Sequence, residues 1–219
     1  MAITYFEKER IFKLDTPASS YVIGIVDKEN FVGHVYYGKK LRDANIAYLL
    51  RTGEGPFVPS ENNRERVSFY DTFPMEYAGN GLGDYRRSSI SVRTAGGHTA
   101  VSLFYVSHKI CETLELLCED PVLGLKVTLL YTAFSDVDVI TRSVRIENDG
   151  EMLYLTKALS FSMDMDNRDF TLLTMHGSWA RERMLEHRKV KKGFMGVESV
   201  RGESSHQEHP FMALAAGNA

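Results

Sequence analysis

This chain has no long apolar run and no large excess of positive or negative charge, and each of these absences excludes a class of protein. No run approaches the roughly 20 apolar residues that a membrane-spanning helix needs. The formal net charge is -3 and the pI about 6.2, so neither nucleic acid nor an anionic membrane is expected as a main partner. The opening residues, MAITYFEKER, reach charged side chains before any apolar core, which favours a cytoplasmic protein over a secreted one.

Cysteine is scarce as well, occurring only at Cys111 and Cys118. Both lie in a stretch that alternates like a strand, where seven residues span roughly 23 Å at about 3.3 Å each. The two side chains would also lie on opposite faces of that strand. A disulfide between them is therefore not expected unless a turn intervenes.

What the chain does contain is apolar alternation with a period of two, most clearly over residues 123–161. Turn signals at 135–138 (SDVD) and 148–150 (NDG) divide this stretch into three runs, which predicts consecutive antiparallel strands. The expected apolar faces are Leu125, Val127, Leu129 and Tyr131, then Ile140, Val144 and Ile146, then Leu153, Leu155, Leu159 and Phe161. Arg142 interrupts the second face. A meander with one dry face needs a covering layer, so we predict an all-β domain of two packed antiparallel sheets with little helix.

The rest of the chain supports the same class. Strands are expected at 2–7, 11–16, 19–27, 30–41, 88–94, 100–108, 113–120 and 170–176. Two or three helical turns are expected at 41–50, a long loop at 51–66, a glycine turn at 79–83, an acidic loop at 164–169 and a polar tract at 178–192. A length of 219 residues suits one large sandwich, so one domain is predicted.

Motifs that would carry chemistry are incomplete. His206 and His209 are three residues apart, but no third ligand stands at a recognisable spacing, so no metal site is predicted. The glycines of GNGLGDY are followed by neither Lys-Ser/Thr nor a helix, so they predict a turn with positive φ rather than a phosphate site. Ser204, Ser205 and His206 do not lie in a G-x-S-x-G motif, so no nucleophilic serine is predicted there. No pair of carboxylates stands out. We therefore predict no catalytic residue and no cofactor in this chain.

Aromatic side chains beside charged ones, in GDYRR (83–87) and GSWARER (177–183), would suit a sugar, which stacks on a ring and hydrogen-bonds to charged groups. The alternative at the second segment is an edge-strand tryptophan packed under an arginine stem.

Several of these segments, taken in order, resemble the N-terminal domain of the bacterial family 36 α-galactosidases. They are GDYRRSS from Gly83, SHKI from Ser107, DVITRS from Asp138, GSWARER from Gly177 and RGESSHQEHPFMAL from Arg201 to Leu214. The similarity runs from about Phe31 to the last residue and implies a β-supersandwich.

The resemblance also implies that the complete enzyme removes terminal α-linked galactose from melibiose, raffinose and related oligosaccharides with retention. Both catalytic carboxylates of that family are aspartates on a (β/α)8 barrel that follows the sandwich, and the complete enzyme is expected to be a homo-oligomer, a tetramer. The strand–helix alternation of a barrel is absent from all 219 residues. We therefore expect residues 1–219 to be an incomplete N-terminal β-supersandwich domain, inactive alone.

By resemblance, the arginine beside VSFYD, Arg66, is the expected substrate-proximal residue, with Arg51 to Glu54 behind it. The alternative is a solvated charge in the polar run NNRER. Two departures from the family stand out. The excursion that usually follows SHKI is missing, so Cys111 and Glu112 alone join two strands, and His209 replaces an asparagine.

Two other functions stay open at this point. One is a stand-alone sugar-binding sandwich module without catalysis. The other is a truncated product whose unpaired strand edges and apolar surface make it aggregate. The expected absence of final strands favours aggregation over binding.

Overall fold

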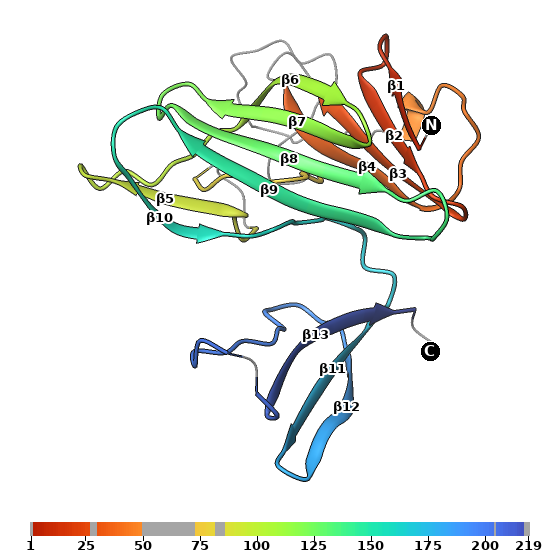
Figure 1. The fold of residues 1–219 in the computed structure, drawn as a ribbon, viewed down its shortest axis with the longest axis vertical. Helices are drawn as coiled ribbons and strands as arrows, with labels where there is room; N and C mark the ends of the chain where they lie inside the picture. The colour runs from red at the N-terminus through yellow and green to blue at the C-terminus, as the bar shows by residue number, and fades with distance from the viewer. Residues whose placement is uncertain (1, 27–29, 50–72, 82–85, 204, 217–219) are drawn as a thin grey trace. The chain divides into compact units, whose positions relative to one another are not determined.

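The computed structural model describes residues 2–26, 30–49, 73–81, 86–203 and 205–216. The chain divides into two compact units, Met1–Asp164 and Met165–Ala219, and each is described by itself. Nearly all regular structure in the described residues is antiparallel strand, so the predicted all-β class is confirmed (Figure 1). No helix in these ranges is both long and apolar enough to cross a membrane. The assignment of residues 1–219 to one incomplete supersandwich domain stays a prediction.

In its described residues, the first unit contains two four-stranded antiparallel sheets and a two-stranded one (Figure 1). One sheet has the order β1-β2-β3-β4, formed by Ile3–Phe6, Ile11–Asp15, Ser19–Val26 and Phe31–Lys39. The other has the order β6-β7-β8-β9, formed by Phe104–Ile110, Thr113–Asp120, Leu125–Ala133 and Ile140–Asn148. The short sheet pairs β5, Ile90–Thr94, with β10, Leu153–Ala158.

The apolar alternation of β8 explains why the two large sheets pack face to face. Its predicted dry face, Leu125, Val127, Leu129 and Tyr131, is at most 2% exposed. These side chains belong to one apolar cluster with Phe12, Leu14, Tyr21 and Ile23 of the opposite sheet. Full burial of a leucine-sized side chain stabilises a fold by roughly 1.5–3 kcal/mol, so this shared core holds the sandwich together.

The prediction that 123–161 forms one three-stranded meander is wrong for its last strand. β8 pairs with β9 as expected, but β10 pairs with β5 rather than with β9. The amide of Asp149 donates to the carbonyl of Gly124 at 3.0 Å, which holds the turn after β9 against the preceding β7–β8 turn. The chain then leaves β9, and Leu155, predicted to be on a dry face, is 51% exposed.

The two or three helical turns expected over residues 41–50 are also wrong. Among the described residues 41–49, only a single turn of 3-10 helix forms, η1 at Ala47–Leu49. The side-chain oxygen of Asn45 accepts from the amide of Ala47 at 3.0 Å, and the amide of Leu41 donates to the Ser20 hydroxyl at 2.9 Å. These side-chain bonds replace the backbone bonds that a longer helix would need.

The short connection after SHKI is confirmed. β6 and β7 are joined by Cys111 and Glu112 alone, and the Cys111 amide donates to the Thr113 carbonyl at 3.1 Å. Cys111 is exposed, Cys118 is buried, and both are free thiols. The prediction that both lie in one strand is wrong, because Cys111 lies in the turn and only Cys118 lies in β7. β6 begins at Phe104, later than the predicted Ala100, because the Val101 amide donates to the Asn80 carbonyl and the Ser102 amide to the Asp120 carboxylate, and neither donates to a strand carbonyl.

The second unit is a three-stranded antiparallel sheet of order β12-β11-β13. β11 spans Thr171–Ser178, β12 spans Arg181–Lys189 and β13 spans Glu208–Ala215. The predicted strand at 170–176 is confirmed, whereas β12 lies within the stretch read as a polar tract. β12 is exposed at every position except Arg188, so its sequence carries no apolar alternation that would reveal a strand.

Candidate functional site

Arg66, the residue predicted to lie near substrate, is outside the described residues, as are Arg51 to Glu54. The description resumes at Phe73, seven positions after Arg66. The segment 73–78, which we call the anchor segment, is therefore the nearest described part of the chain on that side. Its contacts form an extensive buried polar site in the described part of the first unit.

Main-chain bonds fasten the anchor segment to β4. The His34 amide donates to the Pro74 carbonyl at 2.9 Å, and the Glu76 amide donates to the Val32 carbonyl at 3.1 Å. Between them, Gly33 lies so close to Phe73 that an added Cβ would be 2.2 Å from its ring, which only glycine permits. The anchor segment thus continues the first sheet without being a regular strand.

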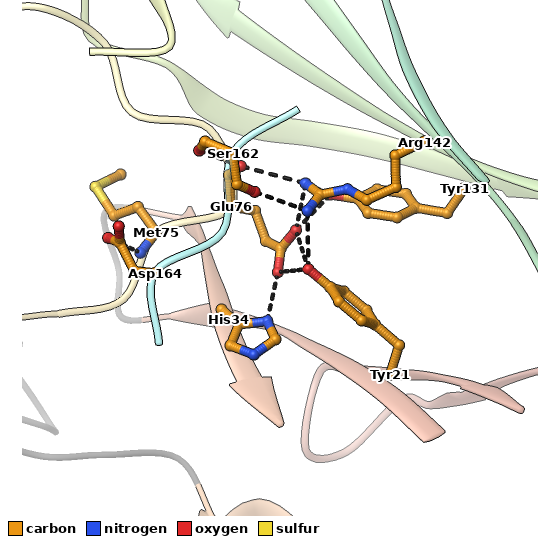
Figure 2. A network of polar contacts seen from close by, with 8 residues as sticks. All are labelled: Tyr21, His34, Met75, Glu76, Tyr131, Arg142, Ser162 and Asp164. Atoms are coloured by element: carbon orange, nitrogen blue, oxygen red, sulfur yellow. Dashed lines mark hydrogen bonds and ion pairs between the residues drawn. The ribbon is translucent and has the colours of Figure 1, made fainter. Parts of the chain in front are cut away.

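The centre of the site is the carboxylate of Glu76, which is completely buried (Figure 2). Tyr21 donates its hydroxyl to both carboxylate oxygens, at 2.7 and 2.9 Å, and His34 Nδ1 donates to Oε1 at 2.8 Å. Tyr131 donates to Oε2 at 2.8 Å, and the Arg142 guanidinium forms an ion pair with the same oxygen at 2.7 Å. Every oxygen of this buried charge is therefore satisfied, as burial requires.

Strand register explains why these partners meet. Tyr131 of β8 and Arg142 of β9 are direct cross-strand partners on the core face. Tyr21 of β3 faces them from the opposite sheet, and a bulge in the β3–β4 pairing lies beside His34. Bulges redirect side chains, and here the His34 ring packs 5.0 Å from the Tyr21 ring. The site therefore links both sheets through the anchor segment.

Electrostatics favour an ionised Glu76. Burial by itself would raise the pKa of this carboxyl, but the charge of Arg142 and the bonds from His34 and Tyr21 outweigh it and hold the pKa below the usual 4.5. Burial, reinforced by the Glu76 charge, raises the pKa of Tyr21 and of Tyr131 well above 10.0, so both stay protonated donors. Burial lowers the pKa of Arg142, but the Glu76 charge and both tyrosines outweigh it and raise the pKa above its ordinary value.

Arg142 also reaches a second segment, residues 159–164, at the end of the first unit (Figure 2). Its Nη1 donates to the Ser162 carbonyl at 2.7 Å, while the Ser162 hydroxyl donates to the Glu76 carbonyl at 3.0 Å. The Asp164 carboxylate accepts from the Met75 amide at 3.1 Å and pairs with Arg86. Two segments distant in sequence are therefore joined at this one site.

This arrangement is suited to holding the chain in place, and not to reacting with a substrate. Glu76 has no exposed surface, and its oxygens are occupied by four side chains of the protein. A general acid or base has to reach the proton that it transfers, which Glu76 does not do here. The prediction that the chain supplies no catalytic residue concerns the whole sequence and stays a prediction.

Of the other residues singled out in the sequence, Arg86 of GDYRR lies at this site, where it pairs with Asp164 and donates to the Phe73 carbonyl at 2.8 Å. Gly81 has φ +84, as expected of the glycine turn, whereas Gly83 is outside the described residues. Trp179 lies between β11 and β12 and is 83% exposed, so it is not packed under an arginine stem. His206 is exposed and His209 half-buried, and no group of three or more metal-ligating side chains occurs in the described ranges.

Sequence reasoning noticed Arg142 only as an interruption of an apolar face, and it did not identify Glu76. The sequence signal that could have identified the site is the combination of Arg142 on a core face with Glu76 in an apolar stretch. A cation on a core face requires a buried anion, and Glu76 is the single charged residue in the apolar stretch FPMEYAG.

Comparison with known proteins places the chain. Residues 30–219 match the model of the glycosyl hydrolase family 36 N-terminal domain. Alpha-galactosidase AgaA of Geobacillus stearothermophilus is 36% identical over 240 residues, covering 100% of this chain and 33% of AgaA. Alpha-galactosidase Mel36A of Lactobacillus acidophilus is 32% identical, and the alignment covers 97% of this chain and 32% of Mel36A.

A solved structure supports the same family assignment. The crystal structure of an AgaA variant from Geobacillus stearothermophilus in complex with raffinose superposes with a TM-score of 0.87 at 36% identity, over 95% of this chain and 32% of that one. The chain spans about a third of the length of these relatives. It belongs to glycosyl hydrolase family 36, whose N-terminal domain residues 30–219 match.

Proposed function

We propose that this chain is the N-terminal part of an α-galactosidase that hydrolyses terminal α-galactosides such as raffinose and melibiose with retention. The observation that carries the proposal is the match of essentially the whole chain to the first third of α-galactosidases, one of them solved with raffinose. In this proposal the two catalytic carboxylates lie on the barrel of the complete enzyme. The sandwich supports that barrel and the mouth of its active site, so the chain alone is inactive.

A chimera tests this proposal. The chain replaces the matching N-terminal third of AgaA, and galactose release from raffinose is measured for the chimera, for the chain alone and for the remaining two thirds of AgaA. We expect activity from the chimera and none from the chain alone. Hydrolysis by the chain itself, or a folded chimera without activity, would contradict the proposal.

We further propose that Arg66 contacts the substrate at the mouth of the active site. A hydrogen bond from a charged group contributes roughly 1.5–3 kcal/mol, so Arg66→Ala in the chimera should lower kcat/KM for raffinose by about tenfold or more. Arg64→Ala is the matched control, since it removes the same charge two positions away. Equal effects of the two substitutions would show that Arg66 is only one of several solvated charges.

We also infer a cytoplasmic location and a homo-oligomeric, tetrameric assembly for the complete enzyme. The assembly is supported by the resemblance to the family. Sedimentation of the active chimera would test the assembly, and a monomeric active enzyme would exclude it.

A further inference from the structure

We infer that a cleft at one end of the first unit binds a small neutral oligosaccharide, a property that goes beyond the proposed function and does not depend on it. The cleft, which we call the end cleft, has a volume of about 710 Å³. Sites for small molecules measure roughly 300–1,000 Å³, so the end cleft has the size of a ligand site. It opens where β8 ends, and the turns that follow β2, β6 and β8 line it (Figure 1).

The lining of the end cleft combines apolar surface with hydrogen-bonding groups. Its apolar members include Ile3, Pro17, Ala133 and Phe134, and its charged members are Asp15, Lys40, Glu112 and Asp136. The side chain of Phe134 is 39% exposed, so part of its ring is open to a ligand. A sugar stacks its apolar face on a ring and hydrogen-bonds its hydroxyl groups to charged side chains. The lining therefore matches the two kinds of surface that a sugar presents.

Several polar groups of the end cleft are available to a ligand. Among the described residues, neither Glu112 nor Asp136 has a hydrogen-bond or ion-pair partner, and both are exposed. Lys40 Nζ donates to the Thr16 carbonyl at 2.9 Å, which uses one of its three protons. Asp15, in contrast, already accepts from two side chains of the protein. The available groups thus include both acceptors and a donor, as the hydroxyl groups of a sugar require.

Other classes of ligand fit this lining less well. A metal ion needs at least three converging ligands, and no such group of His, Cys, Asp or Glu occurs in the described ranges. An anion would be repelled, because the carboxylates of the lining outnumber its one lysine. A wholly apolar ligand would bury Glu112 and Asp136 without hydrogen bonds, which costs free energy. A neutral molecule with many hydroxyl groups avoids all three difficulties.

Hydrogen bonds between the two large sheets hold the walls of the end cleft in place. Asp138, in the turn after β8, accepts from the hydroxyls of Thr16 and Ser19, the latter at 2.7 Å. The Lys40 amide donates to the Ala18 carbonyl at 2.9 Å, which fastens the turn after β2 to the end of β4. A site whose walls are already ordered loses less free energy when a ligand binds.

Cys111 provides a direct test, because it lines the end cleft and is exposed, whereas Cys118 is buried. The rate at which an aromatic disulfide reagent labels Cys111 is measured in the chain at increasing concentrations of raffinose. Maltotriose is the second neutral oligosaccharide, and spermidine represents organic cations. We expect at least one of the two oligosaccharides to slow labelling several-fold in a saturable way, because the bound sugar covers the thiol, and spermidine to leave the rate unchanged.

Variants assign the protection to the end cleft. Phe134→Ala removes the ring and should weaken protection several-fold. Asp136→Asn removes one carboxylate and should raise the concentration for half-protection about tenfold. Phe134→Tyr keeps the ring, and Glu151→Gln removes an exposed carboxylate between β9 and β10, outside the lining. Both controls should be protected like the unchanged chain, and near-ultraviolet circular dichroism shows whether each variant is folded.

Three results would overturn the inference. In the first, neither oligosaccharide slows labelling at its highest soluble concentration. In the second, Phe134→Ala and Asp136→Asn are protected as strongly as the unchanged chain, so the sugar does not bind in the end cleft. In the third, spermidine protects Cys111 and the oligosaccharides do not. Because the assay involves no hydrolysis, an inactive AgaA chimera would contradict the proposed function and leave this result unaffected.

Discussion

Replacing Arg142 alone by methionine should strongly destabilise the first unit at neutral pH. Methionine occupies similar volume, so little cavity forms, but the Glu76 carboxylate stays buried at 0% exposure without its cation. Removing one partner of a buried ion pair costs about 3–5 kcal/mol. With a urea dependence of about 2 kcal/mol per molar, the unfolding midpoint should fall by about 1.5–2.5 M.

The pH dependence gives this prediction a sharper signature. In the unchanged protein the pKa of Glu76 is below 4.5, so its contribution to stability is present above that pH and is lost as pH falls through the folded-state pKa. Without Arg142, the largest effect that opposes burial is lost, so we expect burial to raise the pKa of Glu76 above its unfolded value. The carboxyl then stabilises the variant at low pH and destabilises it as pH rises. The difference between the two proteins should therefore be largest near pH 7 and smallest near about pH 4.

The assay is urea unfolding followed by the near-ultraviolet circular dichroism of tyrosine. Tyr21 and Tyr131 are buried in the network and report on the first unit, whereas the single tryptophan, Trp179, is in the second unit. Arg145→Met serves as the control and should cost less than about 1 kcal/mol, as exposed ion pairs do. A cost below about 1 kcal/mol for Arg142→Met, or a cost independent of pH, would refute the reasoning.

Two further predictions follow from burial and close backbone approach. Burial raises the pKa of the Cys118 thiol to about 12, so an aromatic disulfide reagent at pH 8 should titrate only Cys111 in the folded chain and both cysteines in urea; two fast thiols before unfolding would contradict this. Gly79→Ala should lower stability by about 1–3 kcal/mol, because its Cβ would be 2.0 Å from the carbonyl oxygen of Val101. Gly96→Ala, whose nearest contact is an ordinary 3.6 Å, is the control, and equal unfolding midpoints would disprove the clash.

The sequence revealed strands wherever one face is dry. Leu125, Val127 and Leu129 alternate with polar residues because one side of β8 meets the core and the other meets water, and that contrast is local. β12 lacks the contrast, since nearly all of it is exposed, and it was read as a polar tract. A local pattern also does not identify the neighbouring strand in a sheet. The sequence therefore predicts that β10 pairs with β9, whereas it pairs with β5.

The site was less predictable than the fold for the same physical reason. Glu76 and Tyr21 are 55 positions apart, and each of these buried polar groups is satisfied only because the other is present. Arg142 interrupts an apolar face in the sequence, and its ion-pair partner, Glu76, is not evident because it comes from a distant segment. Resemblance to a family supplied Arg66, which lies outside the described residues and is tested by the chimera and its variants.

The same long separations have a consequence for how the chain folds during synthesis. β6 to β9 pair with their neighbours in sequence, so this sheet can assemble quickly from local hairpins. The first sheet also pairs neighbours in sequence and is made earlier, but the layer that covers it comes later, since the guanidinium that reaches the Tyr21 hydroxyl is 121 residues further along the chain. Until that part leaves the ribosome, the core face of the first sheet is uncovered and its edges are open to other chains. Slow translation between the two sheets should therefore increase misassembly, whereas slow translation after β10 should not.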